Sequence, residues 1–148
     1  MLNSRAEVIQ TCIDHIQAQI YLEIGIFDGE NFARIQAGEK YAVEPYPNIS
    51  NPSIKKQFDQ WFAKSKLFNM GSDDFFAQYE QLLKAKQLDV VFVDGLHTYE
   101  QAYKDTLNAL THLKDGGFVI LHDCLPPHAA AATAAASIFD AENQKPPG

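Results

Sequence analysis

The chain has 148 residues, of which 46% are hydrophobic and 21% are charged, a balance typical of one globular domain. Its formal net charge of −7 argues against a nucleic-acid partner, because binding to a phosphate backbone depends on clustered lysines and arginines. The first residues lack a signal-peptide core, no apolar run is long enough to span a membrane, and the two cysteines have no metal-type spacing, so we expect a cytoplasmic protein with no membrane partner.

Five short apolar runs alternate with stretches of helical periodicity along the chain. The runs cover residues 20–24, 41–43, 66–70, 90–93 and 118–121. The last two are rich in β-branched residues and apolar on both faces, as in strands of a parallel sheet that is covered on both sides. This alternation predicts an α/β fold with a doubly wound, mostly parallel sheet and helices on both faces.

Four stretches between these runs are predicted to be helices, each with an apolar stripe. The second begins with Asn51 as a cap and Pro52 at its first helical position. The stripes consist of Ile9, Cys12, Ile13 and Ile16; of Ile54, Phe58, Trp61 and Phe62; of Phe75, Phe76, Tyr79, Leu82 and Leu83; and of Ala102, Tyr103, Leu107, Leu110 and Leu113.

Short polar residues mark the starts of the third and fourth predicted helices. Ser72 or Asp73 is expected to cap the third. Thr98 is expected to cap the fourth, with the Gln101 side chain reaching back three residues later. We expect this helix to end at residues 116–117, two glycines for which a left-handed conformation costs little.

The end of the sequence differs in composition from the rest. Residues 129–136 are all alanine except Thr133, and the chain closes on Lys145, two prolines and a glycine. Alanine favours helix, but the run has almost no bulky apolar stripe. We therefore expect one domain over residues 1–127 and a helical or disordered tail over 128–148.

Two features near the first two strands indicate a ligand site. Gly25 and Gly29 follow the first strand, where glycine permits a tight turn and a close approach of ligand to backbone, although an ordinary strand–turn–helix also explains them. The spacing is not the G-x-G-x-x-G pattern of an NAD site. Glu44 ends the second strand, a position at which a carboxylate commonly accepts hydrogen bonds from ribose hydroxyls, although a solvated Glu would look the same.

Polar and ionisable residues also follow the three later strands. Ser72 and Asp73 come after the third strand, where they could contact an adenine or simply cap a helix. Residues 94–97, which include Asp94 and His97, follow the fourth strand, and His122 and Asp123 follow the fifth. Because ligands bind at the carboxyl ends of open parallel sheets, we expect these side chains to gather at one site.

Three segments of the sequence resemble the class I S-adenosylmethionine-dependent methyltransferases. They are LEIGIFDGENF, VFVDGLHTYEQAYKDTLNAL and LKDGGFVILHDC. They are most similar to the branch of small-molecule and sugar O-methyltransferases, the methyltransferase domain 24 type, over roughly residues 18–127. The resemblance implies a Rossmann-like sheet that binds S-adenosylmethionine. It places the methionine end by Glu23, Gly25, Phe27 and Gly29, the ribose on Glu44, the adenine near Ser72 and Asp73, and the sulfonium near Asp94.

The sequence departs from this family in two ways. Metal-dependent relatives carry acidic residues at the ends of the fourth and fifth strands, and the matching positions here are Asp94, His122 and Asp123. A set with a histidine suits transition metals better than Mg²⁺. Family members also have two further strands after the fifth, and no convincing strand follows Leu121. Either those strands are missing or a partner chain closes the sheet, for example in a homo-oligomer.

The resulting hypothesis is O-methylation of a small-molecule substrate. His97 or His122 would take the proton from the acceptor hydroxyl, with Asp94 beside the reacting groups, or a metal at Asp94 and Asp123 would lower the pKa of the hydroxyl. Two alternatives are a non-catalytic or truncated cofactor-binding domain and an NAD-type oxidoreductase.

Overall fold

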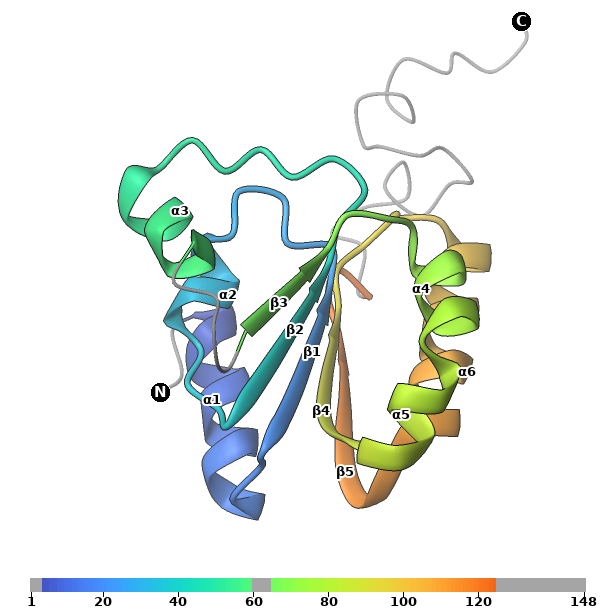
Figure 1. Ribbon diagram of the computed structural model, residues 1–148. Coiled ribbons are helices and arrows are strands. Elements are labelled where there is room, and N and C mark those ends of the chain that lie inside the picture. Colours follow the sequence, from blue (N-terminus) through green and yellow to red (C-terminus); the bar gives the residue numbers. More distant parts are fainter. Residues whose placement is uncertain (1–3, 60–64, 125–148) are drawn as a thin grey trace, which may run out of the picture.

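The computed structural model describes residues 4–59 and 65–124 and has a central sheet between two layers of helices (Figure 1). The strands are β1 (Ile20–Ile24), β2 (Glu39–Val43), β3 (Ser65–Phe68), β4 (Leu88–Val93) and β5 (Leu113–Leu121). Their order in the sheet is β3-β2-β1-β4-β5, and every neighbouring pair is parallel. The predicted α/β fold with a doubly wound parallel sheet is confirmed.

Helices cover both faces of this sheet, as Figure 1 shows. One layer contains α1 (Arg5–Ile16), α2 (Glu30–Arg34) and α3 (Pro52–Asp59), and the other contains α4 (Ser72–Gln78), α5 (Glu80–Lys86) and α6 (Tyr99–His112). Successive residues of a strand point to opposite faces, so β1 sends Tyr21 into one hydrophobic core and Leu22 into the other. Both faces of β1 and β4 are buried, which explains their continuous apolar sequences.

The predicted helix starts are partly confirmed. The side chain of Asn51 accepts a hydrogen bond from the N–H of Ser53 at 3.0 Å, and α3 begins at Pro52. The prediction that Ser72 or Asp73 caps α4 is wrong, because Gly71 is the N-cap and its carbonyl accepts from Phe75 N. Ser72 and Asp73 are instead the first residues of the helix.

The fourth predicted helix, α6, differs from its prediction at both ends. The Thr98 hydroxyl does accept from Gln101 N, at 3.4 Å. The Gln101 side chain, however, donates to Asp105 at 3.0 Å instead of reaching back to the cap. The helix ends at His112 and not at 116–117, because Leu113 already pairs with Leu88 as the start of β5. Gly116 has a φ of +80° within this strand.

The predicted apolar stripe of α6 does not face the core. Tyr103, Leu107 and Leu110 are exposed, whereas Asp105 and Ala109 are buried. By contrast, the stripe of α1 packs on the sheet as predicted, through Ile9 and Ile13 with Ile16 partly buried. The stripe of the third predicted helix divides at Tyr79 between α4 and α5.

Some expectations concern parts of the chain that the structure does not describe. Trp61, Phe62 and the tail over 128–148 lie outside the described residues. Residues 122–124, which follow β5, contain no strand, and the expectation of missing later strands stays a prediction. No helix within the described ranges has the length and apolar character needed to cross a membrane.

Candidate active site

The carboxyl ends of β1, β2 and β4 open onto a pocket of about 770 Å³. The turn after β1, the acid after β2, the start of α4 and the segment after β4 all contribute to its wall. Almost all of the predicted site residues line it: Glu23, Gly25, Phe27, Glu44, Ser72, Asp73, Asp94, His97, His122 and Asp123. The parallel sheet therefore gathers residues up to 100 positions apart at one edge.

Gly29 is the predicted site residue that does not line the pocket. It is the N-cap of α2, with a φ of +77°, and a Cβ at this position would lie 3.1 Å from side-chain atoms of Ile54 and Phe58. Its glycine is explained by the turn and by packing against α3, so its predicted contact with a ligand has no support from this geometry.

Gly25 brings the ends of three strands close together. Its N–H donates to the Val43 carbonyl at 2.8 Å, and a Cβ at this position would lie 2.1 Å from the carbonyl oxygen of Asp94. Its φ of +83° adds a second reason for glycine. The backbone after β1 thus runs directly against the backbone that carries Asp94.

Glu44 joins the end of β2 to the turn after β1. One of its carboxylate oxygens accepts from Phe27 N at 3.1 Å, and the other accepts from Tyr46 N at 2.9 Å. Phe27 has a positive φ of 46°, which is uncommon for a residue with a side chain. Its ring and that of Tyr46 are exposed beside the pocket, where two large apolar surfaces could receive a planar ligand.

Glu23 is a buried carboxyl group in the wall of the pocket. Its two oxygens accept hydrogen bonds from the Tyr21 hydroxyl at 2.6 Å and from the Asn31 amide at 3.1 Å. Burial raises the pKa of Glu23 to about 7, although these two hydrogen bonds oppose the shift. Both the neutral and the ionised form of Glu23 are therefore populated near neutral pH, and a cationic ligand would favour the ionised form.

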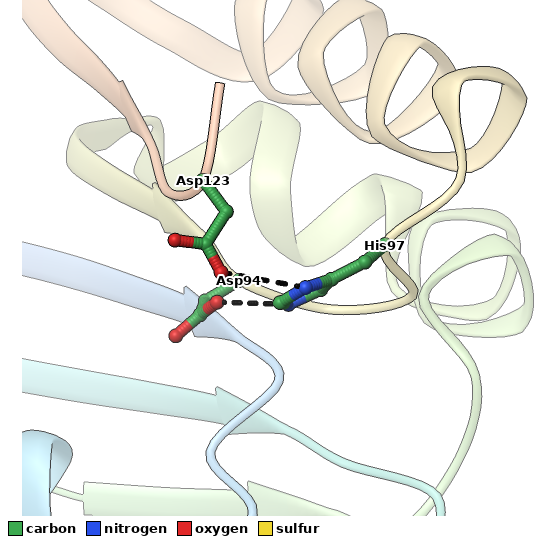
Figure 2. A group of neighbouring side chains, drawn as sticks. All are labelled: Asp94, His97 and Asp123. Atoms are coloured by element: carbon green, nitrogen blue, oxygen red, sulfur yellow. Dashed lines mark hydrogen bonds and ion pairs between the residues drawn. The ribbon is translucent and has the colours of Figure 1, made fainter. Parts of the chain in front are cut away.

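His97, which follows β4, faces the carboxylates of Asp94 and Asp123, and Figure 2 shows both on the same side of its ring. Its Nε2 is 3.1 Å from Asp94 Oδ1, and its Nδ1 is 3.5 Å from Asp123 Oδ2. Asp94 is mostly buried, whereas His97 and Asp123 are about half exposed. The imidazole thus contacts two carboxylates and is still accessible to a ligand in the pocket.

His122 lies deeper than His97 in the same cluster. Its Nδ1 is 3.0 Å from Asp94 Oδ1 and 3.2 Å from Asp123 Oδ1. Neither contact has the orientation of a hydrogen bond, and within the described part of the chain this buried nitrogen has no hydrogen-bond partner. The His122 ring packs edge-on against Phe92. The His122 side chain thus contacts both a strand of the sheet, through Phe92, and the carboxylates of the pocket.

The side chains of Ser72 and Asp73 contact residues of α6. The Gln101 amide nitrogen donates to Ser72 Oγ at 3.2 Å and to Asp73 Oδ1 at 3.1 Å. Lys104 lies 3.5 Å from Asp73. The two residues that the sequence predicts to contact an adenine are therefore positioned by side chains of another helix.

Comparison with known proteins identifies the family. A family model described as a methyltransferase domain matches residues 22–124, which include the last three residues of β1, all of β2 to β5 and the pocket residues from Glu23 to Asp123. The chain belongs to the class I S-adenosylmethionine-dependent methyltransferases. No curated protein matches the sequence of this chain significantly.

A solved structure supports the fold of this methyltransferase. An rRNA methylase from Streptococcus thermophilus superposes with a TM-score of 0.62 and 12% sequence identity. The match covers 84% of the present chain and 75% of the other. At this identity the likeness concerns the Rossmann-like fold.

The pocket of the methyltransferase fits the methyl donor that its family implies. Its volume lies within the range of roughly 300–1,000 Å³ that small-molecule sites occupy. The turn at Gly25 forms part of its wall. Six carboxylates line the pocket, which suits a positively charged sulfonium; they belong to Glu23, Asp28, Glu44, Asp73, Asp94 and Asp123.

Sequence reasoning missed three residues of the methyltransferase site. Asn31 hydrogen-bonds Glu23, Gln101 hydrogen-bonds Ser72, and Arg5 forms an ion pair of 2.6 Å with Asp94. Asn31 and Gln101 lie one turn or less into helices that follow strand ends, a position that could have drawn attention to them. Arg5 lies 89 residues from its partner, and no pattern in the sequence connects the two.

Proposed function

We propose that this methyltransferase transfers the methyl group of S-adenosylmethionine to a hydroxyl oxygen of a small molecule in the pocket at the carboxyl edge of the sheet. The observation that carries the proposal is the placement of His97, held by Asp94 and Asp123, in the same pocket as Gly25 and Glu44. A candidate base and residues that could bind the cofactor therefore line the same pocket.

The proposed donor-binding residues follow the order of the strands. Glu23, Gly25 and Phe27 would hold the methionine end, with ionised Glu23 toward the ammonium group. Glu44 would accept hydrogen bonds from the ribose hydroxyls, which each contribute about 1.5–3 kcal/mol when the acceptor is charged. Both Glu44 oxygens already accept a backbone N–H, and the remaining lone pairs of a carboxylate are free for such bonds.

Ser72 and Asp73 would face the adenine. Their support is positional: both line the pocket, and Gln101 holds both side chains in place. The exposed rings of Phe27 and Tyr46 beside the same pocket offer apolar surface for a planar base.

The chain's contribution to the chemistry is mainly alignment and proton removal. The bound donor supplies a methyl group on a sulfonium, which an oxygen nucleophile can attack in line. Fixing the acceptor against this group can contribute roughly 7–11 kcal/mol in favourable cases. In the neutral ring Nε2 would donate to Asp94, and Nδ1, which contacts Asp123 only at 3.5 Å, would accept the hydroxyl proton. The carboxylates of Asp94 and Asp123 would stabilise the positive charge that the ring acquires.

His97 is a better candidate base than His122. His97 is about half exposed to the pocket and has a carboxylate at each ring nitrogen. His122 is more buried and packs against Phe92. We assign His122 a supporting role, in which its ring limits the movement of Asp94 and Asp123.

A divalent metal is the alternative means of activating the acceptor. The ligand atoms of Asp94, His97 and Asp123 lie within 4.8 Å of one another, and the set predicted from the sequence, Asp94, His122 and Asp123, is also close-packed. Two carboxylates and an imidazole suit a transition metal. Removal of metal by a chelator should leave turnover intact if His97 acts as a base and should abolish turnover if a metal is required.

The acidic lining favours a small neutral or cationic acceptor over RNA. Six carboxylates would repel the phosphates of a nucleic acid, and the net charge of −7 acts in the same direction at long range. The rRNA methylase with a similar fold makes RNA the appropriate comparison substrate.

The experiment has a binding arm and a transfer arm. Calorimetric titration should show affinity for S-adenosylhomocysteine and none for NAD. Radiolabelled methyl transfer is then measured with a panel of small hydroxylated compounds and with rRNA. Transfer to a hydroxyl of the panel supports the proposal. Transfer to rRNA alone contradicts the choice of substrate, and binding without any transfer favours the non-catalytic alternative.

A further inference from the structure

Arg5 places a guanidinium at the pocket from outside the family-matched region. It is the first residue of α1, which Ser4 caps and which Ala6 and Ile9 anchor in the core. The family match begins at residue 22, so the family model does not include this helix. The Arg5 Nη1 atom lies 2.6 Å from Asp94 Oδ2, and the Arg5 side chain lines the pocket.

Arg5 is the one permanent cation among the described residues that line the pocket. It faces an acidic wall, since its charge acts on buried Glu23 together with the charge of Asp94. A guanidinium has five N–H donors, and in the described part of the chain the Arg5 side chain makes one hydrogen bond, to Asp94. The remaining donors are available to a ligand, and Arg5 is half exposed.

We propose that Arg5 binds the α-carboxylate of the methyl donor. This inference rests on the proposed function, because it requires the donor to occupy this pocket with its amino-acid end near Glu23. That end carries both an ammonium and a carboxylate. Glu23 and Asp94 suit the ammonium, but the same carboxylates repel the ligand's carboxylate unless a cation is present. The planar fork of Arg5 matches a carboxylate in geometry as well as in charge.

A pair of ligands that differ only in the carboxylate tests this inference. Calorimetry measures the affinity of the full-length wild-type chain for S-adenosylmethionine and for its decarboxylated analogue, which keeps the sulfonium and the amine. The same titrations are made with Arg5→Met, which removes the charge, and with Arg5→Lys, which keeps it without the fork. Arg34→Met is the matched control, because Arg34 is exposed on α2 and does not line the pocket.

The expected result is a loss that depends on the carboxylate. Arg5→Met should weaken binding of S-adenosylmethionine by about 10- to 100-fold and should not weaken binding of the decarboxylated analogue. Arg5→Lys should recover part of the loss, and Arg34→Met should change neither affinity. An equal effect of Arg5→Met on both ligands, or no effect on either, overturns the inference. If the wild-type chain binds neither ligand, the proposed function itself fails.

Discussion

At the scale of single residues, His97 and its two carboxylates carry the proposed chemistry. His97→Gln should lower kcat by about 10²–10⁴-fold, the usual contribution of a general base, and should change the affinity for S-adenosylhomocysteine little. His15→Gln is a suitable control, because His15 is exposed on α1 outside the pocket. Turnover of His97→Gln at the wild-type rate would remove His97 from the mechanism.

Glu23 should make the free energy of unfolding depend on pH. Its pKa is about 7 in the folded protein and about 4.5 when unfolded. A raised pKa means that the neutral carboxyl stabilises the fold below pH 4.5, and that this contribution is lost as pH rises to 7 and above. Glu23→Gln should therefore be more stable than wild type at pH 8, by on the order of 3 kcal/mol, and similar to it at pH 4.5.

Urea unfolding of both proteins at several pH values measures this difference. Because all other titrating groups are shared, their contributions cancel in the comparison. If the two proteins differ in free energy of unfolding by the same amount at pH 4.5 and pH 8, the pKa of Glu23 is not raised in the folded protein.

Gly25 should tolerate no side chain. Its φ is positive, and a Cβ at this position would lie only 2.1 Å from the Asp94 carbonyl oxygen. Gly25→Ala should therefore cost more than about 3 kcal/mol or prevent folding. Gly71→Ala is the matched variant, since Gly71 also lines the pocket and nothing lies within 4 Å of its Cβ position. Circular dichroism during urea unfolding compares the two, and similar stabilities would contradict the described turn.

At the scale of helices and strands, local signals in the sequence were sufficient for most of the sheet. Residues 20–24 form β1 as predicted, and the last two apolar runs lie within β4 and β5. The apolar run of β4 follows from burial on both faces. The expectation of burial on both faces is wrong for the run of β5, which lies at the edge of the described sheet and whose residues are only partly buried or exposed. The extra residues at the start of β5 were not predictable, because Leu113 leaves the helix to pair with Leu88, a partner that only the assembled sheet provides.

The face of α6 shows where periodicity fails. Its sequence has an apolar stripe, but the buried side is set by Ala109, by Asp105, which Gln101 and Ser72 stabilise, and by His112, which stacks on Phe76. A helix with apolar side chains on one face and small or hydrogen-bonded side chains on the other can pack against a sheet by either face. The sequence pattern alone does not distinguish the two.

Leucines on α5 and α6 should therefore differ in their contribution to stability. Leu83→Ala should cost about 2–5 kcal/mol, because Leu83 is fully buried. Leu110→Ala should cost less than about 1 kcal/mol, because half of Leu110 is exposed. Chemical denaturation of the purified variants measures both. Equal losses would show that the α6 face is buried in solution, as in the homo-oligomer that remains a prediction from the sequence.

At the scale of the whole molecule, the parallel sheet brings polar residues that follow separate strands together in one pocket. Gly25, Glu44, Asp94 and Asp123 each follow a strand, and the sheet brings all four to one pocket. The rule that ligands bind at the carboxyl edge was enough to predict this gathering. The same rule could not predict that Arg5 reaches the pocket from a helix before β1. Nor could it predict that Gly29 does not line the pocket.

The central claim is that the turn after β1 and the acid after β2 hold opposite parts of one adenosyl ligand. A crystal structure of the chain grown with saturating S-adenosylhomocysteine tests it most directly. The account predicts ribose hydroxyls within hydrogen-bond distance of the Glu44 carboxylate and the amino-acid end beside Glu23 and Gly25. An adenosyl group bound elsewhere, with the space between Gly25 and Glu44 filled by protein side chains, would contradict it.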